Sequence, residues 1–168
     1  MSARSTTTFT TRESGKSEQF VKCKLEHVTN QPGLWKDSDP VRPDLDVEFK
    51  TQPGRGVFGL KCEDGEWAAF LCYARTFLIP KTVKELDEFT AVDGNIVVPY
   101  TVWSRKKGAG RAIINHVLQM ASRSSMNVDR VVTLSPLTDM ARKFHLRNNA
   151  TQFRMNDLTV NFEYEIPK

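Results

Sequence analysis

The sequence is short of several features that would indicate its class at once. No apolar stretch approaches the roughly 20 residues that a membrane-spanning helix needs, and its first residues contain no apolar core of a secretory signal. Its three cysteines, Cys23, Cys62 and Cys72, show no Cys-x-x-Cys spacing, so neither a disulfide framework nor a metal site is predicted. We therefore expect a cytoplasmic protein with reduced, buried thiols and no membrane association.

The charge excess is also small. The 168 residues include 24 basic and 20 acidic side chains, which gives a formal net charge of +4. A bias of this size permits an anionic cofactor but does not imply a nucleic-acid partner. The length suits one domain. Residues 1–18 are rich in Ser and Thr and are expected to form a disordered tail, which leaves residues 19–168 as a single domain.

Apolar periodicity and turn residues predict a mixed α/β chain. An Asp64-Gly65 pair between two strand-like runs predicts a hairpin, and Thr82 is placed to cap a short helix. Residues 30–56 hold four prolines and three glycines and are predicted to be loop, with a short helix or strand possible around Val47. The predicted strands are 20–26, 57–63, 66–75, 95–104, 129–135, 152–155 and 158–165, and the predicted helices are 80–89, 112–121 and a segment after Thr138. This order predicts a sheet whose middle strands are joined by a helical crossover.

The most informative segment is Arg-Lys-Lys-Gly-Ala-Gly-Arg at 105–111, between a buried strand and an amphipathic helix. Gly108 and Gly110 lack a Cβ, so backbone amides can approach a ligand closely. The N-terminus of the following helix favours an anion, and Arg105, Lys107 and Arg111 add positive charge. The segment therefore predicts a cradle for a diphosphate.

These residues carry a resemblance to a known family. Arg105-x-x-Gly108-x-Gly110, with its strand and helix, resembles the acyl-CoA-binding motif of the GCN5-related N-acetyltransferase (GNAT) superfamily. The later Thr138-x-x-Ala141-x-x-Phe144-His145 is similar to that superfamily's Asn-x-x-Ala-x-x-Phe-Tyr helix. The resemblance covers about residues 57–165. It implies an α/β (α+β) fold with a mostly antiparallel, twisted sheet, splayed central strands and flanking helices. The dinucleotide fingerprint Gly-x-Gly-x-x-Gly fits less well, because Ile113 replaces its third glycine.

The resemblance also implies a cofactor and the residues that bind it. The cofactor would be acetyl-CoA or another acyl-CoA, with the backbone near 102–104 bonding its peptide-like arm and the loop holding its diphosphate. Thr138 would touch the same arm, although a plain helix N-cap is an alternative role. The implied cofactor-binding residues are Val102, Trp103, Ser104, Arg105, Lys106, Lys107, Gly108, Ala109, Gly110, Arg111 and Thr138.

Catalytic residues are less clearly marked. His145 stands where the superfamily has a tyrosine that protonates the departing CoA thiolate, and a histidine can do that work near neutral pH. The alternative is a hydrogen-bonded histidine at the core edge, against Met140 and Ala141. An attacking amine also needs a general base, and the strand 95–104 has no carboxylate. The candidates are Glu66, Asp93 and, in the loop 30–56, Glu48, each of which is alternatively a solvated surface charge.

A second resemblance lies in the C-terminal third. Thr133-Leu134-Ser135-Pro136 and the segments 144–150 and 160–164 are similar to the end of malonyl-CoA decarboxylase, whose catalytic domain is related to the same fold. That enzyme carries its catalytic histidine in a long insertion where this chain has only residues 137–143. The similarity therefore supports acyl-CoA binding rather than decarboxylation.

The function predicted from these motifs is acyl-CoA-dependent N-acyl transfer, most simply of an acetyl group to a primary amine by direct attack. The acceptor could be a small molecule or a protein, and the loops that would select it, 30–56 and 77–94, carry no decisive motif. One alternative is an acyl-CoA-binding module without catalytic activity. A less favoured one is a small basic nucleic-acid-binding protein that uses Arg105–Lys107 and the tryptophans.

Overall fold

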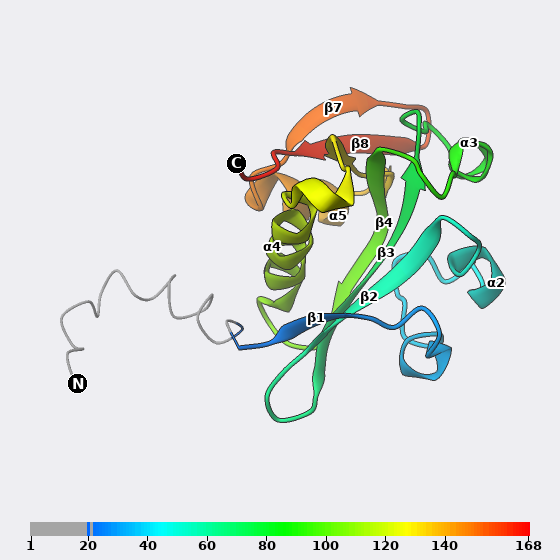
Figure 1. The fold of residues 1–168 in the computed structure, drawn as a ribbon. Coiled ribbons are helices and arrows are strands. Elements are labelled where there is room, and N and C mark those ends of the chain that lie inside the picture. The colour runs from blue at the N-terminus through cyan, green and yellow to red at the C-terminus, as the bar shows by residue number, and fades with distance from the viewer. Residues whose placement is uncertain (1–19, 21) are drawn as a thin grey trace.

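The chain folds around a single β-sheet in the computed structural model, which describes Phe20 and residues 22–168 (Figure 1). The predicted tail, residues 1–18, lies outside the described residues. The strands are β1 Lys24–His27, β2 Arg55–Lys61, β3 Trp67–Thr76, β4 Ile96–Ser104, β5 Arg130–Val132, β6 Ser135–Pro136, β7 Thr151–Met155 and β8 Thr159–Tyr164. The α-helices are α2 Val47–Lys50, α3 Val83–Phe89, α4 Ala109–Ala121 and α5 Asp139–Arg147, with 3-10 turns at Pro32–Leu34 and Ser124–Met126.

The strand order is β1-β2-β3-β4-β5-β8-β6, with β7 paired to β8. Only the β4–β5 pairing is parallel among the described strands. These two strands are connected through α4, as a parallel pair requires. The predicted mixed, mostly antiparallel sheet is therefore confirmed.

Most local predictions follow from turn and cap chemistry. Gly65 has φ +86° in the β2–β3 hairpin, and the Thr82 side chain accepts a hydrogen bond from Glu85 N as the N-cap of α3. The expected first strand starts later, at Lys24, because Cys23 N donates to Phe20 O and closes a turn. The predicted strand 129–135 is divided in two. Its middle residues change partner, since Thr133 N donates to Phe162 O of β8 while Leu134 N donates to Pro99 O of β4.

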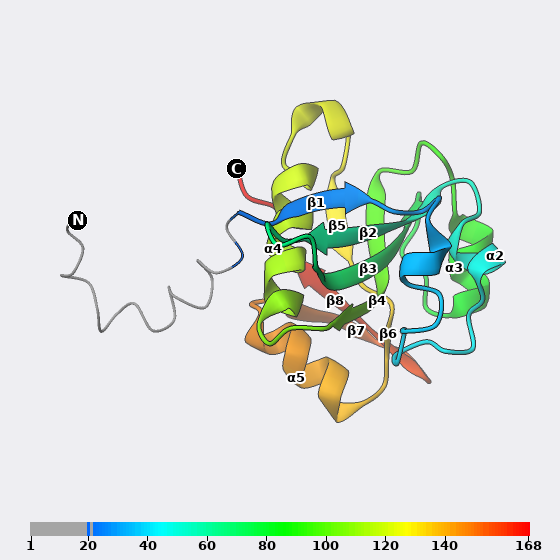
Figure 2. The same ribbon diagram turned by 90° about the horizontal axis from the view of Figure 1, so that it is seen from below.

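Two apolar layers cover the two faces of the sheet. On one face α4 packs its buried side chains, among them Ile113 and Val117, against β1, β2 and β3. On the other face lies a second cluster that includes Trp35, Leu86 and Tyr100. Figures 1 and 2 show α4 and α5 on one side of the sheet and α2 and α3 on the other. Among the described residues, no helix has the length and apolarity to cross a bilayer.

The middle of the sheet opens where β4 bends. Cys72 pairs with Thr101 and Tyr73 with Pro99, so Tyr100 is an extra residue that forms a β-bulge, and a bulge bends its strand and increases the local twist. Pairing of β4 with β5 covers Ile96–Val97 on β4 and Arg130–Val131 on β5. The carboxyl half of β4 therefore separates from its neighbour and then leads into α4.

Candidate functional site

The loop after β4 forms the predicted turn into a helix. Gly108 adopts φ +86° as the N-cap of α4, a left-handed conformation that side chains with a Cβ disfavour by about 1–2 kcal/mol. Ala109 N donates back to Lys106 O at 3.0 Å. The first amides of the 13-residue α4 lack acceptors within the helix and carry its positive dipole end. Backbone donors are therefore concentrated where the sequence predicted an anion cradle.

Gly110 allows a contact between two helices, whereas the sequence predicted a close approach to a ligand. A Cβ built on it would lie 2.9 Å from Cε1 and 3.1 Å from Cζ of Phe144 on α5. A real Cβ essentially never lies within 3.0 Å of another heavy atom, so the missing side chain lets α4 and α5 pack together. Close packing of the two helices explains this glycine without any ligand.

The basic side chains of the loop are largely engaged by the protein itself. Arg105 donates to Leu34 O at 2.8 Å and lies over the Phe70 ring. Lys106 Nζ is 3.3 Å from Asp64 Oδ2. Arg111 donates to Asn148 Oδ1 at 2.7 Å and to the carbonyl of Arg147 at 3.0 Å, at the end of α5. In this arrangement backbone amides and the helix end, more than the guanidinium groups, are placed to receive a phosphate.

Two of the three residues before the loop, Val102 and Ser104, present backbone groups to the opening between the strands. Arg105 N donates to Ala68 O of β3. Along a strand, the backbone groups of successive residues point alternately toward one neighbouring strand and toward the other. The backbone groups of Val102 and Ser104 consequently point away from β3, toward the opening. Ser104 is exposed, whereas the Trp103 side chain is 6% exposed and donates to Ser38 Oγ at 3.1 Å.

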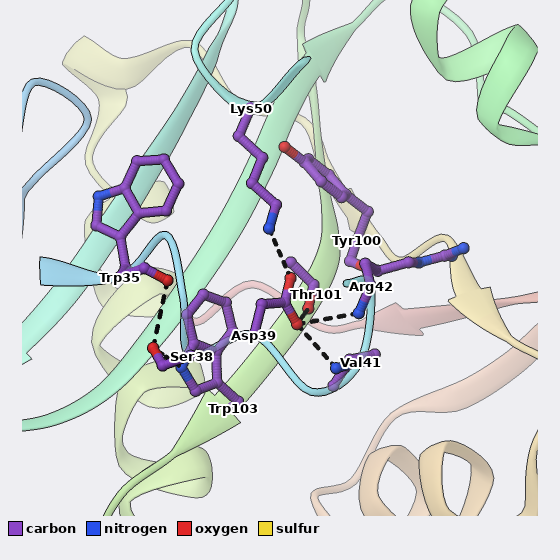
Figure 3. A network of polar contacts seen from close by, with 9 residues as sticks. All are labelled: Trp35, Ser38, Asp39, Val41, Arg42, Lys50, Tyr100, Thr101 and Trp103. Atoms are coloured by element: carbon purple, nitrogen blue, oxygen red, sulfur yellow. Dashed lines mark hydrogen bonds and ion pairs between the residues drawn. The ribbon is translucent and has the colours of Figure 1, made fainter. Parts of the chain in front are cut away.

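A buried polar network that the sequence reasoning missed lies on the face of β4 opposite α4 (Figure 3). The Asp39 carboxylate accepts hydrogen bonds from Lys50 Nζ at 2.8 Å and Thr101 Oγ1 at 2.9 Å. It also accepts from the backbone N–H groups of Val41 at 2.8 Å and Arg42 at 3.0 Å. Four donors around one buried carboxylate make a rigid anchor between the 32–50 segment and β4.

Arg42 joins the two sides of the opening. Its Nε donates to Tyr100 O at the bulge, at 3.2 Å, and its Nη2 donates to Leu134 O at 2.8 Å. Both carbonyls sit where regular pairing between the strands has ended, and a buried carbonyl without a partner is costly. Burial lowers the pKa of Arg42, against the raising effect of nearby carboxylates, but a guanidinium stays charged at neutral pH. Arg42 thus satisfies two carbonyl groups that strand pairing leaves free, and it bridges the two sides of the opening at a fixed separation.

His145 has the geometry of a core residue. It is 6% exposed, its Nδ1 is 2.7 Å from the Tyr164 hydroxyl, and its ring stacks on Phe162 at a centroid distance of 5.1 Å. The expected neighbour Met140 is instead 82% exposed. Burial lowers the pKa of His145 to about 4, so the ring is neutral at pH 7. These features favour the hydrogen-bonded structural role over proton donation.

The other predicted residues lie apart from one another. Glu66 and Asp93 are both exposed, with Glu66 in the β2–β3 hairpin and Asp93 just before β4. The nine residues of β4 span roughly 26 Å at about 3.3 Å per residue, and the two carboxylates sit near opposite ends of that length, so they cannot serve one site. Thr138 caps α5, accepting from Ala141 N at 3.2 Å, which confirms its N-cap alternative. In the described chain, no group of three or more His, Cys, Asp or Glu side chains is placed to hold a metal ion.

Comparison with protein-family models and with curated protein sequences finds no match. Comparison with solved structures finds the GNAT domain of PAT from S. lividans, 14% identical with a TM-score of 0.60, over 84% of this chain and 89% of that one. The loading GNATL domain of CurA from Lyngbya majuscula is 15% identical with a TM-score of 0.64, over 86% of this chain and 98% of that one. Malonyl-CoA decarboxylase from Cupriavidus metallidurans is 13% identical with a TM-score of 0.64, over 90% of this chain but 64% of that one. The chain therefore has the GNAT fold, as its motifs predicted.

Proposed function

We propose that the protein binds an acyl-CoA between β4 and β5 and transfers its acyl group to an amine. The observation that carries this proposal is the continuous path from the bulged, open half of β4 into the Gly108-capped start of α4. That path offers backbone groups suited to an amide-bearing arm and, directly after them, amides suited to a diphosphate. Solved structures with this fold include one described as an acetyltransferase of the GNAT family and one described as a malonyl-CoA decarboxylase.

The residues present fit such a cofactor, and each has a definable part. Loop 105–108 and the first turn of α4 would hold the diphosphate, while the backbone of Val102 and Ser104 would bond the peptide-like arm. Bound acyl-CoA supplies an activated thioester carbonyl. Backbone N–H groups beside the bulge would polarise that carbonyl, and Arg42 and the Asp39 network hold the bulge in place.

An acyl-CoA-binding module without transfer activity is the second candidate, and specific observations favour it. Asp39 is the carboxylate that contacts β4 in this network, but its side chain is 2% exposed and both of its oxygens already accept hydrogen bonds from the four donors, including the Lys50 ammonium. His145 is neutral and buried. This candidate keeps the same cofactor site and lacks an acid and a base.

Calorimetric titration with CoA and acetyl-CoA tests the shared part of both candidates. We expect binding that Lys107→Glu weakens by about tenfold, or about 1.4 kcal/mol, because a carboxylate would replace an exposed cation of the loop. Lys84→Glu is the matched control, since it makes the same charge change on exposed α3. Absence of binding at millimolar CoA, or equal weakening by both variants, would contradict the proposal.

Thiol release from acetyl-CoA in the presence of a panel of primary amines separates the two candidates. Amine-dependent release of CoA supports the transferase. Tight binding with no release above the uncatalysed rate supports the binding module. Titration of DNA and RNA at several salt concentrations addresses the nucleic-acid alternative, which requires an affinity that falls steeply with salt.

A further inference from the structure

Two of the three cysteines face each other across β1 and β2. The register pairs Lys24 with Lys61 and Leu25 with Leu60, which places Cys23 opposite Cys62 at the next position. Cys23 N donates to Phe20 O at 3.1 Å and Cys62 N to Glu66 O at 2.8 Å. Because neither amide bonds the facing residue, this is a non-hydrogen-bonded position, where Cα atoms lie about 4.5 Å apart and side chains are closest.

That spacing is compatible with a covalent link. Disulfides join Cα atoms that lie about 4.4–6.8 Å apart, so this pair can be bridged with little backbone movement. Both thiols are free and in contact with each other. Burial, and next the hydrogen bond to Cys62, raise the pKa of Cys23 to about 12. The two thiols are therefore reduced in this structure and already lie next to each other.

The two thiols also share an accessible surface. Cys62 is half-buried and Cys23 is 5% exposed. Both line a hollow of about 490 Å³, together with Asp64 of the β2–β3 hairpin and with Lys106 and Lys107 of the loop 105–111. A hollow of this size can admit a small molecule. Its charges are mixed, since Lys22 and Glu63 also line it. Cys72, in contrast, is 0% exposed within β3.

We propose that Cys23 and Cys62 form a redox modification site that a small disulfide such as oxidised glutathione converts to an internal disulfide. The more exposed Cys62 attacks first as its thiolate, which gives a mixed disulfide and releases one reduced glutathione. The Cys23 thiolate then attacks the Cys62 sulfur, which closes the internal bond and releases the second glutathione. Two thiol protons are lost to solvent and taken up by the two leaving thiolates, and the protein gives two electrons to the oxidant. The proposal does not depend on acyl-CoA binding.

The test incubates the full-length folded protein with oxidised glutathione and measures intact mass and remaining thiols. For the wild type we expect a mass lower by two hydrogens, no retained glutathione, and one remaining thiol of the three. Cys23→Ser should instead retain a glutathione adduct on Cys62, because the resolving thiol is absent. Cys72→Ala is the control and should form the internal disulfide as the wild type does.

Three results of the mass and thiol measurements would overturn the proposal. These are a stable glutathione adduct on wild-type Cys62, an intermolecular disulfide, or three unreacted thiols after oxidation has reached equilibrium. Circular dichroism of each variant before oxidation shows whether it is folded. Peptide mapping of the wild-type product then identifies the linked residues, and a bond that includes Cys72 would count against the proposal as well.

Discussion

Replacing Asp39 with asparagine removes one charge from a buried ion pair while it keeps the shape of the side chain. Lys50 Nζ lies 2.8 Å from Asp39 Oδ2, and both side chains are 2% exposed. In the variant the Lys50 ammonium stays buried without its counter-charge and faces an amide that can itself donate. Loss of one partner of such a pair costs about 3–5 kcal/mol. For a chain of this size that corresponds to a fall in Tm of roughly 6–20 °C.

The double variant Asp39→Asn, Lys50→Met sharpens this expectation. Methionine is uncharged and can occupy the apolar space beside Trp35 and Trp103, over which the Lys50 ammonium now lies. Replacement of a whole buried pair by uncharged groups is often close to neutral. We therefore expect the double variant to recover at least about 2 kcal/mol relative to Asp39→Asn alone, which is a favourable coupling energy.

Urea unfolding, with the midpoint and the slope fitted together, measures these free energies. Glu163→Gln is a suitable control because its partner Arg130 is 38% exposed and Glu163 itself 28%, and a pair this accessible to water contributes about 0–1 kcal/mol. A loss below about 1 kcal/mol for Asp39→Asn, or a double variant whose loss equals the sum of the two single losses, would refute the assigned network.

Three further changes test other parts of the structure. The pKa of His145 falls from 6.5 in the unfolded chain to about 4 in the folded protein. Its contribution to stability is therefore complete above pH 6.5 and is lost as the pH drops toward 4, by up to roughly 3 kcal/mol. Urea titrations at several pH values should show that the dependence of the unfolding free energy on pH is flattened in His145→Gln but retained in His116→Gln. Gly110→Ala should cost about 1–3 kcal/mol by overpacking against Phe144, and thermal melts should show recovery when Phe144→Leu is added. Thr138→Ala should cost about 1 kcal/mol through the lost cap of α5, and an unchanged unfolding midpoint would argue against that hydrogen bond.

Local sequence signals account for what could be predicted. The β2–β3 hairpin depends on a glycine at φ +86°, and α3 and α5 begin at threonine caps, all of which are readable within a few residues. The loop 105–111 is also contiguous, so its position between strand and helix could be inferred. The bulge at Tyr100 could not, because it depends on how β4 pairs with β3.

The network around Asp39 had no such signal. Asp39 and Arg42 lie in a proline-rich segment, where charged residues are usually solvated, and they meet β4 across 62 and 58 positions of sequence. Both are buried because the segment packs over the sheet, which no local sequence pattern specifies. The role of His145 could not be predicted for the same reason. Its position in the motif suggested proton donation, whereas its hydrogen-bond partner, Tyr164, lies on a strand 19 residues later.

The position of the 32–50 segment also bears on which of the two proposed functions applies. It covers the face of β4 opposite α4, with Trp35 1% exposed and contacts from Ser38 to Trp103 and from Asp39 to Thr101. An acyl-CoA held by the loop before α4 does not need these contacts to change. An amine that approaches the acyl group from the covered face does need them to open. Hydrogen exchange of the segment should therefore increase during turnover if the protein is a transferase, and stay protected with acyl-CoA bound if it is a binding module.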